Sequence, residues 1–428
     1  SRFGKNNKWG YFPSVSAAWR ISKENFLVDN KVINELKLRA SYGETGNFNI
    51  GNFQYLGTVS NAVFSPDNKT VNGIAQTSIA NPDLSWEKVK SYDIGIDLGL
   101  FNNRLTFNLD YYNKRTQGML YQVNVPAITG FTSAIQNIGT VENKGFEIEV
   151  QSRVIADGSF KWNTSFNFST IQNKVLDLGG VNERIIPITI GMDWLLRVGE
   201  PMFSYYSYKM IGIYQDRDEI NNTPHLAGTV PGNPIVEDRN HDGKINTDDR
   251  YIAGNYMPKA TLGFTNQFTW KGFDLSFTLQ SSLGSKIFNE EYLFYQGPNL
   301  GTLRRSVNNQ WWSKDDPGDG KTPGIAISQL YSYITNTDYY IEDASYLNFR
   351  NLNLGYNMSD VVKNTFIKSL RLYLSVNNLF IIKNKNFHGY NPEGVTSGGI
   401  EGINSTPGFN QGSEPMNRRA VIGINLNL

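Results

Sequence analysis

One short segment of the chain carries the residue types that bind a metal ion. In VEDRNHDGKINTDDR, residues 236–250, five acidic residues, two asparagines and one glycine fall within fifteen positions. Counted from Asp238, positions one, three, five, seven, nine and twelve are Asp238, Asn240, Asp242, Lys244, Asn246 and Asp249, with Lys244 offering its backbone carbonyl. Calcium takes six to eight oxygen ligands, and calcium loops use this spacing. The sequence therefore predicts a structural Ca²⁺ site.

This loop differs from a paired calcium sensor. Position twelve is Asp249 rather than the usual Glu, although a shorter carboxylate can still close the site, as in dockerin-like loops. Gly243 would allow the sharp turn, and Ile245 at position eight would anchor the loop on apolar neighbours. The flanking segments read as extended rather than helical, which predicts a single loop. The alternative interpretation is an Asx-rich turn without metal.

Aromatic side chains in a second polar stretch could contact a ligand. Their flat apolar faces suit the rings of sugars or the side chains of peptides, and packing among the loops is the alternative. The candidates for substrate binding are Trp311, Trp312, Tyr339 and Tyr340.

The composition argues against several classes of function. With 40 basic and 39 acidic residues, the chain lacks the excess positive charge of a nucleic-acid binder. It has no cysteine, which excludes disulfides, thiolate zinc sites and iron–sulfur clusters. The three histidines, His225, His241 and His388, are scattered, and no nucleophile elbow or phosphate-binding loop is present. We therefore expect no enzymatic activity.

The elements that must position these residues have a period of two. In SYDIGIDLGL, residues 91–100, the apolar residues from Tyr92 to Leu100 alternate with Asp93, Gly95 and other small or polar residues. The same alternation follows in NRLTFNLDYYN and recurs in GFEIEVQS, GFDLSFTLQS and LRLYLSVNN. Short Asn102–Asn103 and Lys271–Gly272 segments predict tight hairpins. Helical spacing is not sustained anywhere, so we predict an all-β fold.

Two structures can produce this alternation. A soluble sandwich buries the apolar face, whereas a transmembrane barrel turns it to lipid and encloses a polar lumen. The expected strands are long enough to cross a bilayer, their polar faces carry mid-strand charges, and aromatic residues gather at segment ends. No run of about 18 apolar residues predicts a transmembrane helix. These features favour a transmembrane antiparallel β-barrel.

The connections alternate between short turns and long loops, as in membrane barrels. We expect about 12–14 strands, with long extracellular loops near residues 47–84, 176–195, 215–257, 288–345 and 383–417. The chain starts at Ser1 rather than Met, which suggests a fragment or a processed product.

Several long segments resemble one family. These include NKWGYFPSVSAAWRISKENF, NPDLSWEKVKSYDIGIDLGLFNNRLTFNLDYYNKRT, NIGTVENKGFEIEV and DYYIEDASYLNFRNLNLGY. They resemble TonB-dependent outer-membrane transporters, and most closely the SusC-like branch of Bacteroidota. The resemblance runs nearly from end to end and includes the segment with the predicted calcium loop.

The resemblance implies a 22-stranded barrel filled by an N-terminal plug domain that this sequence does not contain. Residues 1–428 would then be the C-terminal part of the barrel. It also implies active import of a glycan or peptide across the outer membrane. The implied partners are a SusD-like surface lipoprotein, outer-membrane lipid and the TonB–ExbB–ExbD complex, which would act through the missing N-terminal part.

Two other functions remain open from the sequence. One is a surface-exposed glycan-binding or adhesin β protein with a structural calcium loop. The other is a passive porin, which the alternation itself permits.

Overall fold

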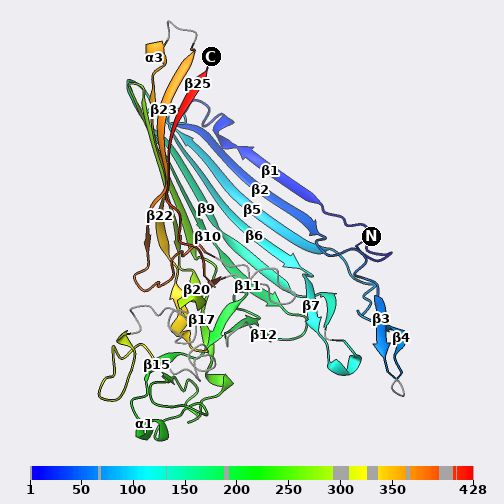
Figure 1. Ribbon diagram of the computed structural model, residues 1–428. Helices are drawn as coiled ribbons and strands as arrows, with labels where there is room; N and C mark the ends of the chain where they lie inside the picture. The colour runs from blue at the N-terminus through cyan, green and yellow to red at the C-terminus, as the bar shows by residue number, and fades with distance from the viewer. Residues whose placement is uncertain are drawn as a thin grey trace.

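The alternating segments form long antiparallel strands in one curved sheet (Figure 1). The computed structural model describes residues 2–65, 69–131, 133–187, 192–292, 308–324, 336–362, 367–394, 408–410 and 412–427. The strands of the main sheet are β1 (Ser14–Arg20), β2 (Ile33–Asn47), β5 (Glu87–Leu100), β6 (Leu105–Gln117), β9 (Thr140–Ile155), β10 (Phe160–Thr170), β18 (Ala260–Trp270), β19 (Phe273–Leu283), β22 (Tyr346–Asn357), β23 (Ser369–Lys383) and β25 (Arg419–Asn427). They pair in chain order, and β11 (Gln172–Asp177) also pairs with β9.

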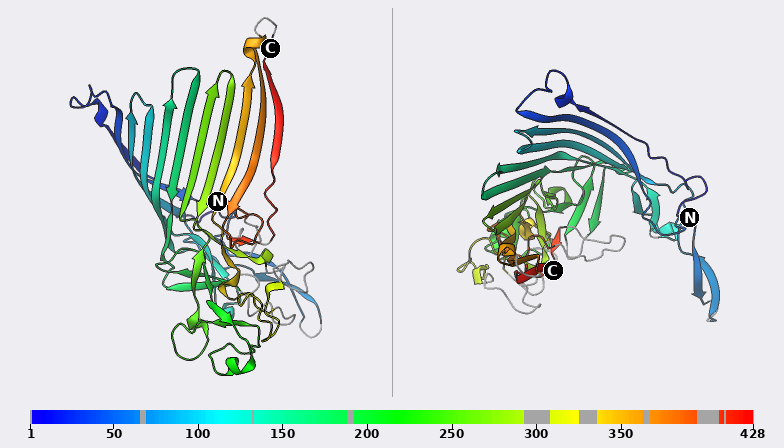
Figure 2. Two further views of the ribbon diagram at one scale, coloured as in Figure 1. Left: turned by 90° about the vertical axis from the view of Figure 1, so that its left-hand side faces the viewer. Right: turned by 90° about the horizontal axis from the view of Figure 1, so that it is seen from above.

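Within the described residues the main sheet has 12 strands, the lower end of the predicted range. Seen from above, it follows an arc whose edge strands are β1 and β25 (Figure 2). The structure confirms an all-β chain built from antiparallel strands of barrel type.

One face of the sheet is apolar and exposed. Register places apolar residues opposite each other from strand to strand, as in the row formed by Leu38, Ile96, Leu109 and Ile148. Ile94 on β5 is 60% exposed, and Ile422 on β25 is 84% exposed. A soluble sandwich would bury this face, so the structure disfavours the sandwich interpretation. An exposed apolar face is what a barrel presents to lipid.

Tight turns gather at one end of the sheet, which we call the turn end. Residues 101–104 join β5 to β6, and Lys271–Gly272 joins β18 to β19. Phe101, Asn102 and Asn103 all have positive φ, as does Lys271 at 45° before Gly272 at 83°. The structure thus confirms both predicted hairpins, and left-handed residues close them as tight hairpins require.

Long connections gather at the opposite end, the loop end (Figures 1 and 2). They span 48–86, 118–139, 171–259, 284–345 and 384–418. The expected loops 176–195 and 215–257 both lie in the connection from β10 to β18. The hairpin in 118–139 was not anticipated, and parts of 288–345 and 383–417 lie outside the described residues. The assignment of this end to the cell exterior stays a prediction.

The loop end contains small sheets and short helices. Its strands are β3 (Val59–Phe64), β4 (Val71–Gln76), β7 (Leu120–Asn124), β8 (Ser133–Asn137), β12 (Glu183–Pro187), β13 (Asp193–Arg197), β14 (Ser204–Ser207), β15 (Met210–Ile213), β16 (Pro234–Val236), β17 (Tyr251–Asn255), β20 (Lys286–Asn289), β21 (Ile341–Asp343) and β24 (Phe409–Asn410). The helices among the described residues are α1 (Arg217–Asn221), α3 (Ser359–Val362) and the 3₁₀ turns η1 (Ile21–Lys23), η3 (Ala127–Thr129), η5 (Thr247–Asp249) and η7 (Asp338–Tyr340). None of the described helices is long and apolar enough to cross a membrane.

Candidate functional site

The polar face of the sheet carries a connected charge network on β2, β5 and β6. Arg39 donates from Nε to Asp97 at 2.8 Å and from Nη2 to Asp110 at 2.8 Å. Lys37 donates to the second oxygen of Asp97 at 2.9 Å. These side chains are 21–30% exposed, so they are partly shielded from water. The sequence predicted mid-strand charges on this face but could not pair them across strands.

Glycines on this face make room for the long side chains. A Cβ on Gly95 would clash with Asp110 and come within 2.7 Å of Arg39 Nη2. Farther along the same polar face, Gly355 lies in register between Asp274 on β19 and Tyr373 on β23. There, Arg371 donates from Nε to Asp274 at 2.9 Å across the glycine. The alternation of glycine with charge therefore reflects packing of ion pairs along the wall.

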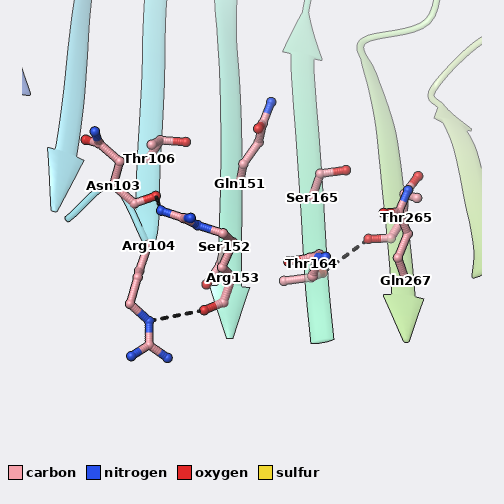
Figure 3. A pocket seen from close by; sticks show the side chains of 11 residues that line it. Asn103, Arg104, Thr106, Gln151, Ser152, Arg153, Thr164, Ser165, Thr265 and Gln267 are labelled. Carbon is pink, nitrogen blue, oxygen red and sulfur yellow. Dashed lines mark hydrogen bonds between the residues drawn. The ribbon is translucent and has the colours of Figure 1, made fainter. Parts of the chain in front are cut away.

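A cavity of about 360 Å³ opens beside the turn end (Figure 3). It is lined by Asn103, Arg104, Thr106, Gln151, Ser152, Arg153, Asn163, Thr164, Ser165, Thr265 and Gln267, which come from β6, β9, β10, β18 and the turn before β6. Arg153 donates to the carbonyls of Asn102 and Asn103, and Arg104 donates to the carbonyl of Val154. Both guanidinium groups therefore hold the strand ends, and the remaining lining consists of hydroxyl and amide side chains.

The predicted metal loop lies at the loop end between β16 and β17. Asp238 accepts the backbone N–H groups of Asp242 at 3.2 Å and Gly243 at 2.9 Å. Asn240 accepts from the N–H of Asp242, and Asp242 accepts from the N–H of Lys244. Gly243 adopts a φ of 79°, the sharp turn expected from the sequence. The first half of the loop is thus folded by its own carboxylate and amide oxygens.

The second half of the loop is tied to the small sheet of β12, β13, β14 and β17. Asp249 is fully buried and accepts the N–H groups of Arg239 and Asn246. Arg250 follows it, donates to Asp193 at 2.6 Å and stacks on the ring of Tyr206. Among the described residues, no group of three or more His, Asp and Glu side chains is arranged to hold a metal ion. Asn side chains and carbonyls supply half of the predicted ligands, so the calcium site stays a prediction.

The predicted aromatic residues differ in exposure. Trp312 is 57% exposed, whereas Tyr340 is 1% exposed within a buried aromatic cluster. Trp311 donates its Nε1–H to Gln215 at 3.0 Å and covers Gly232. Tyr339 packs edge-to-face on Tyr340 at 4.8 Å. Trp312 is therefore the one of these four rings with a freely accessible face.

A buried core at the loop end was missed by the sequence reasoning. Its members are Met192, Trp194, Tyr205, Phe288, Tyr292, Tyr340 and Phe409. Tyr205 is fully buried, and its hydroxyl donates to the carbonyls of Gly408 and Lys286. Phe288 stacks on Phe409, and β20 pairs with β24. Three connections far apart in the chain therefore share one core, which short alternating windows could not reveal.

Burial and charge shift the titration of several loop groups. Burial raises the pKa of Tyr205 far above its usual range. Burial and a hydrogen bond to Asp338 also raise the pKa of Tyr251. The ammonium of Lys209, which donates to Glu237 at 3.0 Å, lowers the pKa of that carboxyl. These groups hold loops together and do not form a nucleophile–base pair. His388 contacts Glu342 through Nδ1 at 2.5 Å, and its ring stacks on Tyr292.

The chain matches the family model described as TonB dependent receptor-like, beta-barrel, over residues 1–379. It is 35% identical over its whole length to TonB-dependent receptor P3 of Formosa agariphila. It is 31% identical over 93% of its length to TonB-dependent receptor SusC of Bacteroides thetaiotaomicron. These alignments cover 42% and 39% of the two relatives, so the chain spans less than half the length of the curated relatives it matches.

A solved structure, that of the RagAB peptide transporter, has a similar fold. The TM-score is 0.80 at 26% sequence identity. The match covers 99% of this chain and 44% of the solved chain. The fold of this chain is therefore similar to that of part of the solved transporter, matched over less than half of the solved chain.

Proposed function

The chain belongs to the TonB-dependent receptor-like β-barrel family, in its SusC-like branch, and we propose that it forms part of the wall of an active outer-membrane importer. The observation that supports this most is the division of the sheet into two faces. One face is apolar and exposed, as lipid requires, and the other carries ion pairs, amides and hydroxyls, as a wet lumen requires. Substrate would enter from the loop end and leave at the turn end.

The partners of the whole protein are proposed by analogy. The energy would come from TonB with ExbB and ExbD, acting on a part of the transporter outside these residues. A SusD-like lipoprotein would cover the loop end and help to capture the substrate. The relatives leave two substrate classes open, since RagAB is described as a peptide transporter and the resemblance also includes importers of glycans. No residue of this chain is proposed to perform catalysis.

Uptake by cells tests this function. A strain lacking the full-length receptor is compared with the complemented strain for import of fractions of a complex nutrient extract. We expect one fraction to enter only when the receptor is present, and uptake to stop when an uncoupler removes the proton motive force. Receptor-dependent uptake that persists in uncoupled cells would instead support a passive porin.

We propose that the loop from Asp238 to Asp249 binds a structural Ca²⁺ ion. The order of oxygen donors and the left-handed turn at Gly243 support this site. An ion there would stiffen a loop that Asp249 and Arg250 already tie to the small sheet. Calorimetry on the chelator-treated receptor should give heat on addition of Ca²⁺, and Asp242→Ala should reduce it. No heat with the parent protein would refute the site.

We further propose that Trp312 contributes an aromatic platform for substrate, because its ring is exposed at the loop end. Trp312→Ala should weaken substrate binding. Trp311→Ala should mainly loosen the loop, because Trp311 packs on Gly232 and bonds Gln215. Equal substrate affinity in the parent and Trp312→Ala receptors would contradict this role.

A further inference from the structure

The exposed apolar face of the sheet changes character where its strands approach the loop end. Ile94, Tyr111 and Phe146 lie in register on β5, β6 and β9, which run side by side (Figure 1). The next row toward the loop end contains Tyr92 and Lys144. The row after that crosses five strands, and it consists of Glu44, Lys90, Arg115, Glu142 and Lys174. Charged side chains therefore replace the apolar surface within two rows.

Five cations stand along this edge of the apolar face, and we call them the basic rim: Lys88, Lys90, Arg115, Lys144 and Lys174. Lys88 belongs to the rim because it is two residues from Lys90, and residues two apart on a strand share a face. Val141 and Val175 are buried in a core of the loop end. Glu142 and Lys174 are each one residue away from them, so they point to the opposite, lipid-facing side.

Glu142 holds two of the five cations in place. Its carboxylate, which is 6% exposed, accepts from Arg115 Nε at 2.8 Å and lies 3.5 Å from Lys144 Nζ. Asn113 donates to the same carboxylate at 3.1 Å. The side chain of Arg115 is 50% exposed, and its bond to Glu142 uses only Nε. The Nη groups of Arg115 therefore remain available to a ligand.

The other three cations have no carboxylate partner of this kind. Within the described part of the chain, no carboxylate forms an ion pair with Lys88, Lys90 or Lys174. Glu44 lies opposite Lys90 in register, but its carboxylate accepts the hydroxyl of Tyr42. Five cations against Glu44 and Glu142 leave an excess of three positive charges along these rows. The basic rim should therefore attract an anion.

The position of the rim indicates which anion fits. Between the rim and the apolar strand centres, Tyr42 packs on Tyr92 at 5.0 Å and Tyr111 packs on Phe146 at 5.1 Å between ring centroids. Aromatic side chains of membrane proteins gather at the level of the lipid headgroups. Lysine and arginine side chains extend toward the headgroups from that level. A lipid can lay its acyl chains on the apolar face and place its headgroup on the rim, whereas a dissolved anion uses the charges alone.

The donors of the rim suit a phosphate group. Arginine presents several N–H donors that match the oxygens of a phosphate, and lysine binds phosphate as a point charge. Lys90 and Arg115 pair in register on neighbouring strands, whose backbones are about 4.8 Å apart. Lys88 is roughly 7 Å farther along β5. These three side chains are therefore close enough to contact one phosphate together.

We propose that Lys88, Lys90 and Arg115 form a binding site for the headgroup phosphate of a lipid in the outer leaflet of the membrane. Lys144 and Lys174 extend this positive surface along the wall. The site lies on the outside of the barrel, apart from the import path. The choice of leaflet rests on the proposed orientation, in which the loop end faces the cell exterior.

Lipid binding to the full-length receptor tests the site. The receptor in a non-ionic detergent is titrated with monophosphoryl lipid A, and bound lipid is counted by native mass spectrometry. Dephosphorylated lipid A tests the need for phosphate, and inorganic phosphate tests the need for acyl chains. Lys90→Gln removes the central cation. Lys114→Gln is the matched control, because Lys114 is exposed one residue from Arg115 and shares the polar face with its register partner Ser91.

We expect Lys90→Gln to weaken binding of monophosphoryl lipid A about fivefold, and Lys88→Gln with Lys90→Gln to weaken it about 25-fold. Lys114→Gln should change it less than about twofold, and dephosphorylated lipid A should bind the parent receptor at least about tenfold more weakly. Heat-modifiable gel migration verifies that each variant is folded.

Three results would overturn the site: unchanged binding by the double variant, an equal loss with Lys114→Gln, or equal binding of the two forms of lipid A. Displacement of the lipid by an equal concentration of inorganic phosphate would show a simple anion site instead of a lipid site. If receptor-dependent, energised uptake persists while lipid binding ignores phosphate, only the lipid site is refuted. Loss of that uptake would refute the import function itself.

Discussion

Removal of Arg39 should destabilise the barrel more than removal of any single exposed charge. Arg39 bridges Asp97 and Asp110, and Asp110 lies opposite Glu147 in register. Arg39→Ala therefore leaves Asp110 without its cation opposite Glu147, and leaves Asp97 with Lys37 alone. Losing the partner of a charged hydrogen bond costs roughly 1.5–3 kcal/mol, and partial exposure reduces this. We expect a loss of about 2 kcal/mol in the free energy of unfolding.

The assay is urea unfolding of the full-length receptor in detergent, followed by the loss of its folded, heat-modifiable gel band. Lys37→Ala is the matched control, since Asp97 would keep its bond to Arg39. It should cost less than about 1 kcal/mol, as partly exposed pairs usually do.

A double-mutant comparison tests whether Arg39 and Asp110 stabilise the barrel as a pair. In the parent receptor, Asp110→Asn should destabilise, because it weakens an ion pair. In the Arg39→Ala receptor the same change should stabilise, because it removes an unpaired charge opposite Glu147. An effect of the same sign and size in both backgrounds would refute the proposed coupling.

Three further predictions concern other parts of the chain. Trp162 donates its indole N–H to Asn266, which is 2% exposed on the apolar face. Trp162→Phe should therefore lower the free energy of unfolding by about 1–3 kcal/mol in the same urea assay, because Asn266 loses a buried partner. Adding Asn266→Leu should recover part of that loss. Tyr205→Phe removes the hydroxyl donor to the carbonyl of Gly408, which then keeps only the N–H of Phe288. The change should speed hydrogen exchange at residues 408–410, and unchanged exchange would contradict the role of the buried core at the loop end. Burial and Asp338 raise the pKa of Tyr251 in the folded protein. The stabilisation that Tyr251 gives to the folded state is therefore complete below the usual pKa of about 10, and it is lost as the pH rises through the higher folded value. Tyr251→Phe should therefore reduce the alkaline loss of loop stability and remove one late-titrating tyrosinate from the absorbance curve.

Much of the wall could be predicted from the sequence. The alternation in residues 91–100 needs only local information, because side chains of a strand point to opposite faces in turn. The turn at Lys271–Gly272 is equally local, since glycine favours the left-handed conformation. These signals were sufficient for the fold class and for the two faces of the sheet.

The partners across the wall could not be predicted in this way. Arg39 and Asp110 are separated by 71 positions, and their contact depends on the register of three strands. The buried core at the loop end was still harder to predict from short segments of sequence, because Tyr205 bonds a carbonyl 203 positions away.

The predicted metal loop contains one feature that the sequence predicted and one that it did not. Spacing alone anticipated the turn at Gly243. Asp249 was assigned as a ligand from its position, and the structure shows its carboxylate buried and bonded to two backbone N–H groups. Such bonds arise from the fold of the loop, and the order of residue types does not specify them.

The most direct test of the account compares two neighbouring residues of β5 that point to opposite faces. Asp93→Cys and Ile94→Cys are placed separately in the cysteine-free, full-length receptor and labelled in outer membranes with a water-soluble maleimide. The account predicts that the thiol at 93 reacts from the wet lumen, while the thiol at 94 stays unreactive in lipid. Rapid labelling at 94 with protection at 93 would contradict a transmembrane wall with its polar face inside.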